Sequence, residues 1–160
     1  MTSKAMLKVG VLLPAAIADV GKFLAEITAL EAAGADTIWV DDSALDPWIV
    51  LGALAAVTRR VRLGCRLTSL QPWPPSRLGP AAATLQTLSR SRTVVGLPGS
   101  TNPSRHIEAL QASGSKIFTT GILEGVSDGV ILNVESADQL SDRAGTYIEV
   151  WAAKIGRAHV

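Results

Sequence analysis

The sequence of 160 residues contains a single cysteine, one tyrosine and two phenylalanines, and its charges nearly cancel. A disulfide needs two thiols and a thiolate zinc site needs several, so the lone Cys65 excludes both within the chain. Fifteen basic and 14 acidic side chains give a net charge of +1, whereas sequence-independent binding of nucleic acid requires a basic surplus. We therefore expect no nucleic-acid partner, and a reducing, cytoplasmic compartment.

Long apolar runs are also absent. The longest, residues 47–58, has about a dozen residues, whereas a helix that crosses a bilayer needs about 20. The residues before the first apolar run, 1–8, lack the apolar region and cleavage site of a signal peptide. The sequence predicts a soluble protein without a membrane partner.

Two glycine-rich nucleotide-binding motifs are missing as well. The turn after the first apolar run, residues 14–18, has no glycine, although a dinucleotide-binding domain places G-x-G-x-x-G there. No G-x-x-x-x-G-K-[ST] motif occurs. No cluster of His, Cys, Asp and Glu has the spacing of metal ligands, so no metal site is predicted.

Hydrophobic residues make up 48% of the chain, and their pattern alternates between two periods. Short apolar runs, typical of strands buried on both faces, are each followed by apolar residues at helical spacing. Strands are expected at 9–13, 37–40, 61–67, 92–97, 116–119 and 129–134, and helices over 19–34, 46–60, 78–88, 103–113 and from Ser136 onward. Strands that alternate with helices pair in parallel through right-handed crossovers, so the fold class is α/β.

Several residues mark where the expected helices begin and end. Asp19 and Asp46 are suited to cap helix N-termini, and Pro47 fits the first helical position, where no N–H is needed. Gly34 and Gly114 stand where a left-handed residue closes a helix. These signals are local, and each predicts one boundary.

The motifs between Trp39 and Gly99 occur together in a recognisable order. They are W-V-D-D at 39–42, D-P-W at 46–48, L-A-A-V-T-R-R-V-R-L-G at 54–64, and T-L-Q-T-L-S at 84–89 followed by Arg92 and Gly96-Leu97. In this order they resemble the luciferase-like monooxygenase family, which consists of flavin- and deazaflavin-dependent oxidoreductases built on a TIM barrel. A second segment, S-D-G-V-I-L-N-V at 127–134, is similar to a late strand of that family.

The resemblance implies an incomplete TIM-like (β/α) barrel of parallel strands. A full barrel needs about 250 residues, so this chain provides about five to six β-α units. We expect one domain over 1–153, made of an N-terminal block, 8–100, and a late-strand block, 116–153. Residues 154–160 resemble a translated sequencing adapter and are expected to be a non-native scar. An unclosed barrel exposes strand edges, which a homo-oligomer would cover.

The same resemblance implies a flavin-dependent oxidoreductase or monooxygenase that acts on a small organic substrate. Its cofactor would be FMN or the deazaflavin coenzyme, which either passes a hydride to the substrate or reacts with oxygen. The chain would be truncated and weakly active. The alternative is a non-catalytic remnant or assembly module that retains the β/α core without binding a cofactor.

Candidate site residues follow from the barrel, because its chemistry lies at the carboxyl ends of the strands. The expected catalytic residues are Asp42 and His106; a polar turn for Asp42 and an exposed, freely titrating His106 are the alternatives. The expected cofactor-binding residues are Arg66, Thr68, Trp73, Gly96, Gly99 and Ser100. Trp73 would stack on a flavin or substrate, or else plug the bottom or side of an incomplete barrel. Cys65, on the apolar side of its strand, is expected to be a buried small hydrophobe rather than a nucleophile.

Overall fold

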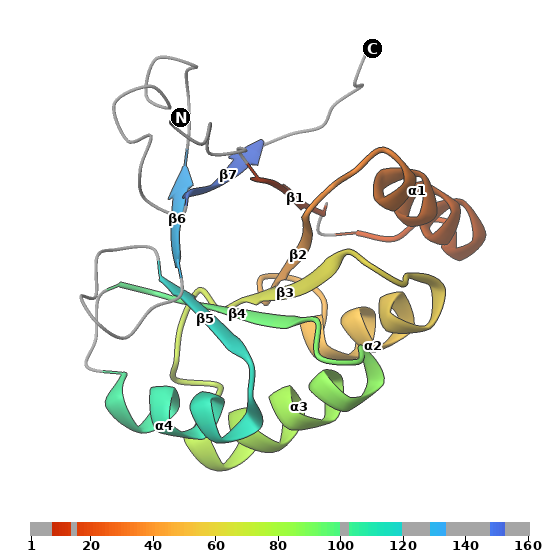
Figure 1. The fold of residues 1–160 in the computed structure, drawn as a ribbon. Helices are drawn as coiled ribbons and strands as arrows, with labels where there is room; N and C mark the ends of the chain where they lie inside the picture. The colour runs from red at the N-terminus through yellow and green to blue at the C-terminus, as the bar shows by residue number, and fades with distance from the viewer. Residues whose placement is uncertain (1–7, 14–15, 100–102, 120–128, 134–147, 153–160) are drawn as a thin grey trace.

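The computed structural model describes residues 8–13, 16–99, 103–119, 129–133 and 148–152. In these segments strands and helices alternate along the chain until β5 (Figure 1). The elements are β1 (Lys8–Leu12), α1 (Val20–Ala32), β2 (Thr37–Asp41), α2 (Pro47–Val57), β3 (Arg62–Arg66), α3 (Pro75–Leu88), β4 (Thr93–Leu97), α4 (Ser104–Ser113), β5 (Lys116–Thr119), β6 (Gly129–Asn133) and β7 (Ile148–Ala152).

The strands form a closed ring in which every pair is parallel and neighbours follow the order of the sequence. The ring closes because β1 pairs on one side with β2 and on the other with β7, where Lys8 lies opposite Glu149. The predicted α/β class and the shortened barrel are therefore confirmed. The expected unclosed barrel edge is wrong, because β7 occupies it.

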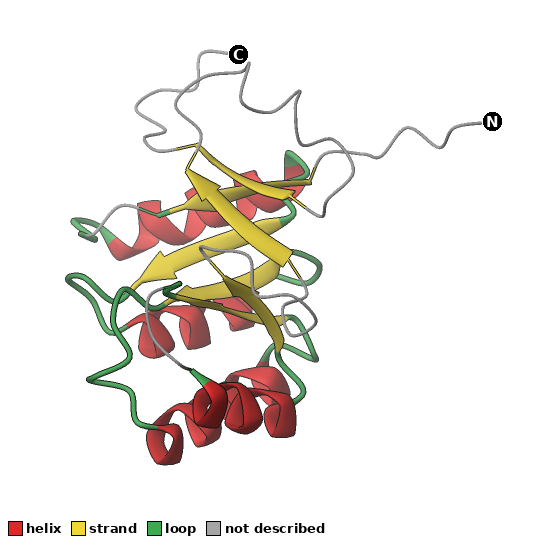
Figure 2. Cartoon of the chain, turned by 90° about the vertical axis from the view of Figure 1, so that its left-hand side faces the viewer, coloured by secondary structure: helices red, strands yellow, loops and turns green. Residues whose placement is uncertain are grey.

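The four helices lie outside the ring, along β2 to β5, as Figures 1 and 2 show. The predicted strands are all present, and no end is shifted by more than one residue. The helix expected from Ser136 lies outside the described residues. Strand β7 was not expected, although Ile148 and Val150 alternate with Glu149 in the manner of a strand.

The predicted helix boundaries depend on local hydrogen bonds that the structure contains. The Asp19 carboxylate accepts from the N–H of Lys22, and the Asp46 carboxylate accepts from the N–H groups of the second and third residues after it. Pro47 is the first residue of α2. Gly34 and Gly114 have φ angles of +91° and +76°, the left-handed conformation expected of them.

Two apolar layers stabilise the barrel. The larger layer lies between the strands and the helices and includes Leu63, Cys65 and Leu67 from one side of β3 and its extension. The smaller layer fills the interior of the ring with Trp39, Val94 and Phe118, all completely buried. Trp39 and Phe118 meet edge-on, with ring centroids 5.9 Å apart.

The absence of a side chain at Gly64 leaves space for the Trp39 indole inside the ring. A Cβ atom built on Gly64 would lie 2.4 Å from Cε3 of Trp39, far inside van der Waals contact. The indole therefore rests directly on the backbone of β3. At the amino end of the same strand, Arg62 forms an ion pair with Asp36 and lies over the Phe118 ring, 5.4 Å from its centroid.

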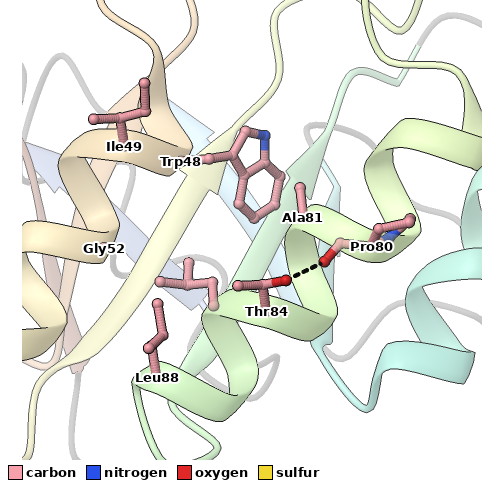
Figure 3. A pocket seen from close by; sticks show the side chains of 8 residues that line it. Trp48, Ile49, Gly52, Pro80, Ala81, Thr84 and Leu88 are labelled. Atoms are coloured by element: carbon pink, nitrogen blue, oxygen red, sulfur yellow. Dashed lines mark hydrogen bonds between the residues drawn. The ribbon is translucent and has the colours of Figure 1, made fainter.

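The buried face of α2 could not be assigned from periodicity, because every side chain from Pro47 to Val57 is apolar. Leu51 and Leu54 are fully buried, whereas Ile49 is 74% exposed. Leu88, the last residue of α3, is also exposed. Ile49 and Leu88 both line a groove of about 320 Å³ between α2 and α3 (Figure 3).

Among the described residues, no helix is long and apolar enough to cross a membrane.

Arg92, just before β4, joins the amino-terminal face of the barrel to the end of α2. Its guanidinium donates to the carbonyl oxygens of Ala55, Thr58, Val61 and Ser89 and to the Thr58 hydroxyl, at 2.6–3.3 Å. The last carbonyls of a helix have no partner inside the helix, and α2 has no basic residue in its last turn. Arg92 supplies the missing donors from another element.

Glu31, in the last turn of α1, binds the backbone on the same face. Its carboxylate accepts from the N–H groups of Arg59, Arg60 and Val61 at 2.8–3.1 Å. Partial burial alone would raise the pKa of Glu31, but these donors, together with the charge of Arg92, outweigh it and lower the pKa below its usual value. In its charged form, Glu31 thus binds the backbone just before β3.

This carboxylate should make stability depend on pH. The folded-state pKa lies below that of the unfolded chain, so the contribution is complete above the unfolded pKa of about 4.3 and is lost as pH falls through the folded pKa. We expect Glu31→Gln to be less stable than wild type at neutral pH, with a difference that shrinks on acidification. Urea unfolding of both proteins from about pH 7 to about pH 3 measures it. A difference that stays constant with pH would contradict this role.

Candidate active site at the carboxyl ends of the strands

Because all strands are parallel, their carboxyl ends meet at one rim of the ring, where the sequence places most of the candidate residues. Asp42 follows β2, Thr68 and Trp73 lie between β3 and α3, and His106 lies in α4. The structure brings these four residues into one hydrogen-bonded cluster, although they come from different β-α units.

Asp42 is the acceptor at the centre of the cluster. Its Oδ1 atom accepts from the backbone N–H of Thr68 at 2.9 Å and from the Thr68 hydroxyl at 2.6 Å, while Oδ2 accepts from Nε1–H of Trp73 at 3.0 Å. A carboxylate has about four acceptor positions, so three of them are used. Asp42 therefore ties the end of β2 to the loop after β3. Its neighbour Asp41 instead accepts from the backbone and hydroxyl of Ser43.

Trp73 is buried to all but 6% of its surface and packs between helices rather than inside the ring. Trp73 therefore does not fill the interior, which Trp39 and Phe118 occupy, but packs on the side of the barrel. Arg77 lies over the Trp73 ring, 4.4 Å from its centroid, and Trp48 meets it edge-on at 6.1 Å. Arg77 was not a sequence candidate, although its position one helical turn after Trp73 is a signal for such a contact.

His106 is half-buried and faces the cluster from α4. Its Nε2 atom lies 2.9 Å from the carbonyl oxygen of Trp73. The residue is thus neither fully exposed nor free of partners.

The remaining candidates lie along the same rim. Arg66 is the last residue of β3 and pairs in register with Gly96 of β4. Gly96 is buried and its carbonyl accepts from the N–H of Leu67 at 2.9 Å, while Gly99 is exposed in the turn after β4. Ser100 lies outside the described residues.

The donors and surfaces at this rim fit a flavin-type coenzyme. Arg66 provides a positive charge and Gly99 a backbone without a side chain, which suit a phosphate and ring carbonyl oxygens. The exposed Thr68 hydroxyl donates its hydrogen to Asp42 and so can only accept a hydrogen bond from a coenzyme. Among the described residues, no group of three or more His, Cys, Asp or Glu could hold a metal ion.

Cys65 is completely buried in the layer between β3 and the helices, as expected. Burial raises the pKa of its thiol well above the usual value, and the nearby carboxylates, Asp42 first among them, raise it further. A thiol held in this state is a poor nucleophile. The structure therefore gives Cys65 a packing role only.

We expect an aromatic disulfide reagent to modify Cys65 only as fast as the native protein opens, and promptly in urea. An Ala53→Cys variant is the control, since Ala53 is exposed on α2 and its thiol should react at once in the native state. Prompt reaction of wild-type Cys65 without denaturant would disprove its burial.

A model of the family described as luciferase-like monooxygenase matches residues 5–109, more than half of the chain. Among curated proteins, an uncharacterized protein of Mycobacterium tuberculosis is 43% identical over 53 residues, 33% of this chain and 19% of that protein. The phthiodiolone/phenolphthiodiolone dimycocerosates ketoreductase of Mycobacterium sp. (strain JLS) is 41% identical over 61 residues, 36% of this chain and 16% of the enzyme. The chain thus matches less than a fifth of either relative's length.

Solved structures show the same fold. The coenzyme F420-dependent tetrahydromethanopterin reductase of Methanopyrus kandleri superposes with a TM-score of 0.67 at 16% identity, covering 91% of this chain and 65% of the reductase. Monooxygenase RslO1 of Streptomyces bottropensis gives 0.59 at 18% identity, with 85% and 63% covered. A type II Baeyer-Villiger monooxygenase of Pseudomonas putida, solved in complex with FMN, gives 0.50 at 14%, with 65% and 32% covered. At these identities the likeness shows the fold.

Proposed function

Since the chain belongs to the luciferase-like monooxygenase family, we propose that it binds FMN or the deazaflavin coenzyme F420 at the carboxyl rim of its barrel. The observation that carries the proposal is the cluster of Asp42, Thr68 and Trp73, which two separate β-α units assemble at that rim. Of the proteins that share this fold, the Methanopyrus kandleri reductase depends on F420, and the Pseudomonas putida monooxygenase was solved in complex with FMN. The bound coenzyme would supply the redox chemistry on a small organic substrate.

The residues of the rim would bind and orient that coenzyme. Arg66 would hold its phosphate through charge-assisted hydrogen bonds, and Thr68 would contact the ring with the oxygen lone pairs not used toward Asp42. Gly99 would let the turn after β4 approach the coenzyme closely, beside Gly96 of β4 and Ser100. Trp73, which is 6% exposed, would act mainly as the anchor of the loop beside the coenzyme, and Asp42 would fix that anchor.

Titration with FMN and, separately, with F420 tests this proposal. We expect one of the two to bind with micromolar affinity, and Arg66→Ala to weaken that binding about ten- to hundredfold, the effect of losing a charge-assisted hydrogen bond. Arg59→Ala is the charge-matched control, because Arg59 is exposed at the opposite face of the barrel. If neither coenzyme binds with micromolar affinity, the oxidoreductase function is excluded, and a remnant or assembly module is favoured.

The chain spans 65% and 63% of the first two solved structures it matches, so activity of the whole protein is part of the proposal. We propose a truncated, weakly active enzyme in one domain, residues 1–153, in the cytoplasm, with 154–160 a non-native addition. A homo-oligomer also stays a prediction, although the strand edge that it was expected to cover is paired. Light scattering after gel filtration measures the oligomeric state.

A further inference from the structure

Hydrogen bonds hold Trp73 at two separate points, its indole and its backbone. The indole Nε1–H donates to Asp42 at 3.0 Å, and the carbonyl oxygen accepts from His106 at 2.9 Å. Asp42 follows β2 and His106 lies in α4, so the two partners approach from different units of the barrel. A turn bond from the Trp73 N–H to the Leu70 carbonyl, at 3.0 Å, adds a third point within the loop.

The contact with Trp73 decides where His106 carries its proton. A carbonyl oxygen only accepts hydrogen bonds, so Nε2 must be the N–H donor. In the neutral ring Nδ1 then has no hydrogen and acts as an acceptor. The Nε2–H is therefore already committed to the Trp73 backbone, whether the ring is neutral or protonated.

We infer that His106 is a positioning residue for Trp73. With Asp42 it clamps the loop of residues 67–74, so that the Trp73 indole has one orientation before any ligand binds. A loop that is ordered in advance lowers the entropic cost of binding against it. The statement about coenzyme affinity rests on the proposed function above, whereas the clamp itself does not.

Labelling with 5-fluorotryptophan tests the clamp without a coenzyme. The chain has four tryptophans, and loss of one ¹⁹F resonance in Trp73→Phe identifies that of Trp73. In His106→Ala we expect this resonance to move toward that of the free amino acid and to become more sensitive to D₂O. His106→Gln, whose amide N–H can replace Nε2–H, should stay at the wild-type position. Glu108→Ala, exposed on the same helix, is the control.

Coenzyme affinity is the second readout. We expect His106→Ala to weaken binding of FMN or F420 about two- to tenfold, the range for one neutral hydrogen bond, and His106→Gln to bind as wild type does. Weak binding by His106→Gln with an unmoved Trp73 resonance would overturn the inference, because the imidazole itself would then serve the ligand.

The inference is also overturned if the Trp73 resonance of His106→Ala stays at the wild-type position. The same holds if the Trp73 resonance of His106→Gln moves as far as that of His106→Ala. If His106→Ala does not fold, the resonance in His106→Gln decides: an unmoved position supports the clamp, and a moved one contradicts it. If wild type binds neither coenzyme, the proposed function fails while the ¹⁹F comparison still decides the clamp.

Discussion

Replacing Gly64 with alanine should lower the free energy of unfolding by about 1–3 kcal/mol, the usual cost of forcing an extra carbon into a packed interior. The new Cβ would lie 2.4 Å from Trp39 Cε3 and under 3 Å from two further atoms of the same ring. Neither the indole nor strand β3 has free space, because Trp39 is completely buried against Phe118. Urea unfolding followed by fluorescence measures the loss.

A control in the same protein separates this clash from the general effect of a Gly→Ala change. Gly52 lies in α2, where an added Cβ would meet nothing within 4 Å. Gly52→Ala should therefore stabilise the protein by about 0.5–1 kcal/mol through helix propensity alone. Trp39→Leu in the Gly64→Ala background should cost less than the sum of the two single changes. Equal effects at Gly64 and Gly52 would show that the interior is not tightly packed.

The second large effect is expected from Arg92→Ala, which should destabilise the protein by about 2–4 kcal/mol. The substitution removes the donors of the carbonyl oxygens of Ala55, Thr58 and Val61, and part of the end of α2 is left without partners. Burial lowers the pKa of Arg92, an effect that the charge of Glu31 partly opposes. The guanidinium nevertheless remains charged at any pH used for the measurement.

Two further variants test whether the forked shape of the guanidinium matters or only its charge. Arg92→Lys keeps the charge but cannot reach acceptors on both α2 and the start of β3, so it should lose more than half as much stability as Arg92→Ala. Arg105→Ala, at an exposed position of α4, should change stability by less than about 0.5 kcal/mol. Full stability in Arg92→Lys would mean that charge alone suffices.

Local signals were sufficient to predict most elements of the fold. Asp19 and Asp46 cap their helices through residues two or three positions away, so no tertiary knowledge was needed. The exposed face of α2 could not be predicted, because an entirely apolar helix has no polar side to identify. Strand β7 has a strand-like alternation, but its pairing with β1 depends on residues at the far end of the sequence.

The candidate site could be located from the sequence but not assembled from it. The rule that parallel strands present their chemistry at one end placed Asp42, Thr68 and Trp73 at the correct rim. The contacts among them were not predictable. Asp42 and Trp73 are separated in the sequence by a helix and a strand, and only the folded β-α crossover brings them within hydrogen-bond distance. The resemblance to the family also depends in part on Thr58 and Arg92, which stabilise the opposite face.

The pairing of β1 with β7 has a consequence for how the chain folds. Strands β1 to β5 each find their neighbour one β-α unit away, so those contacts can form while the ribosome is still adding residues. The contact between Lys8 and Glu149 joins positions near the two ends of the sequence, and such non-local contacts form slowly. Until β7 is synthesised, β1 presents unpaired backbone groups to other chains. We therefore expect aggregation during synthesis to compete with ring closure, and chaperones that shield β1 to raise the yield.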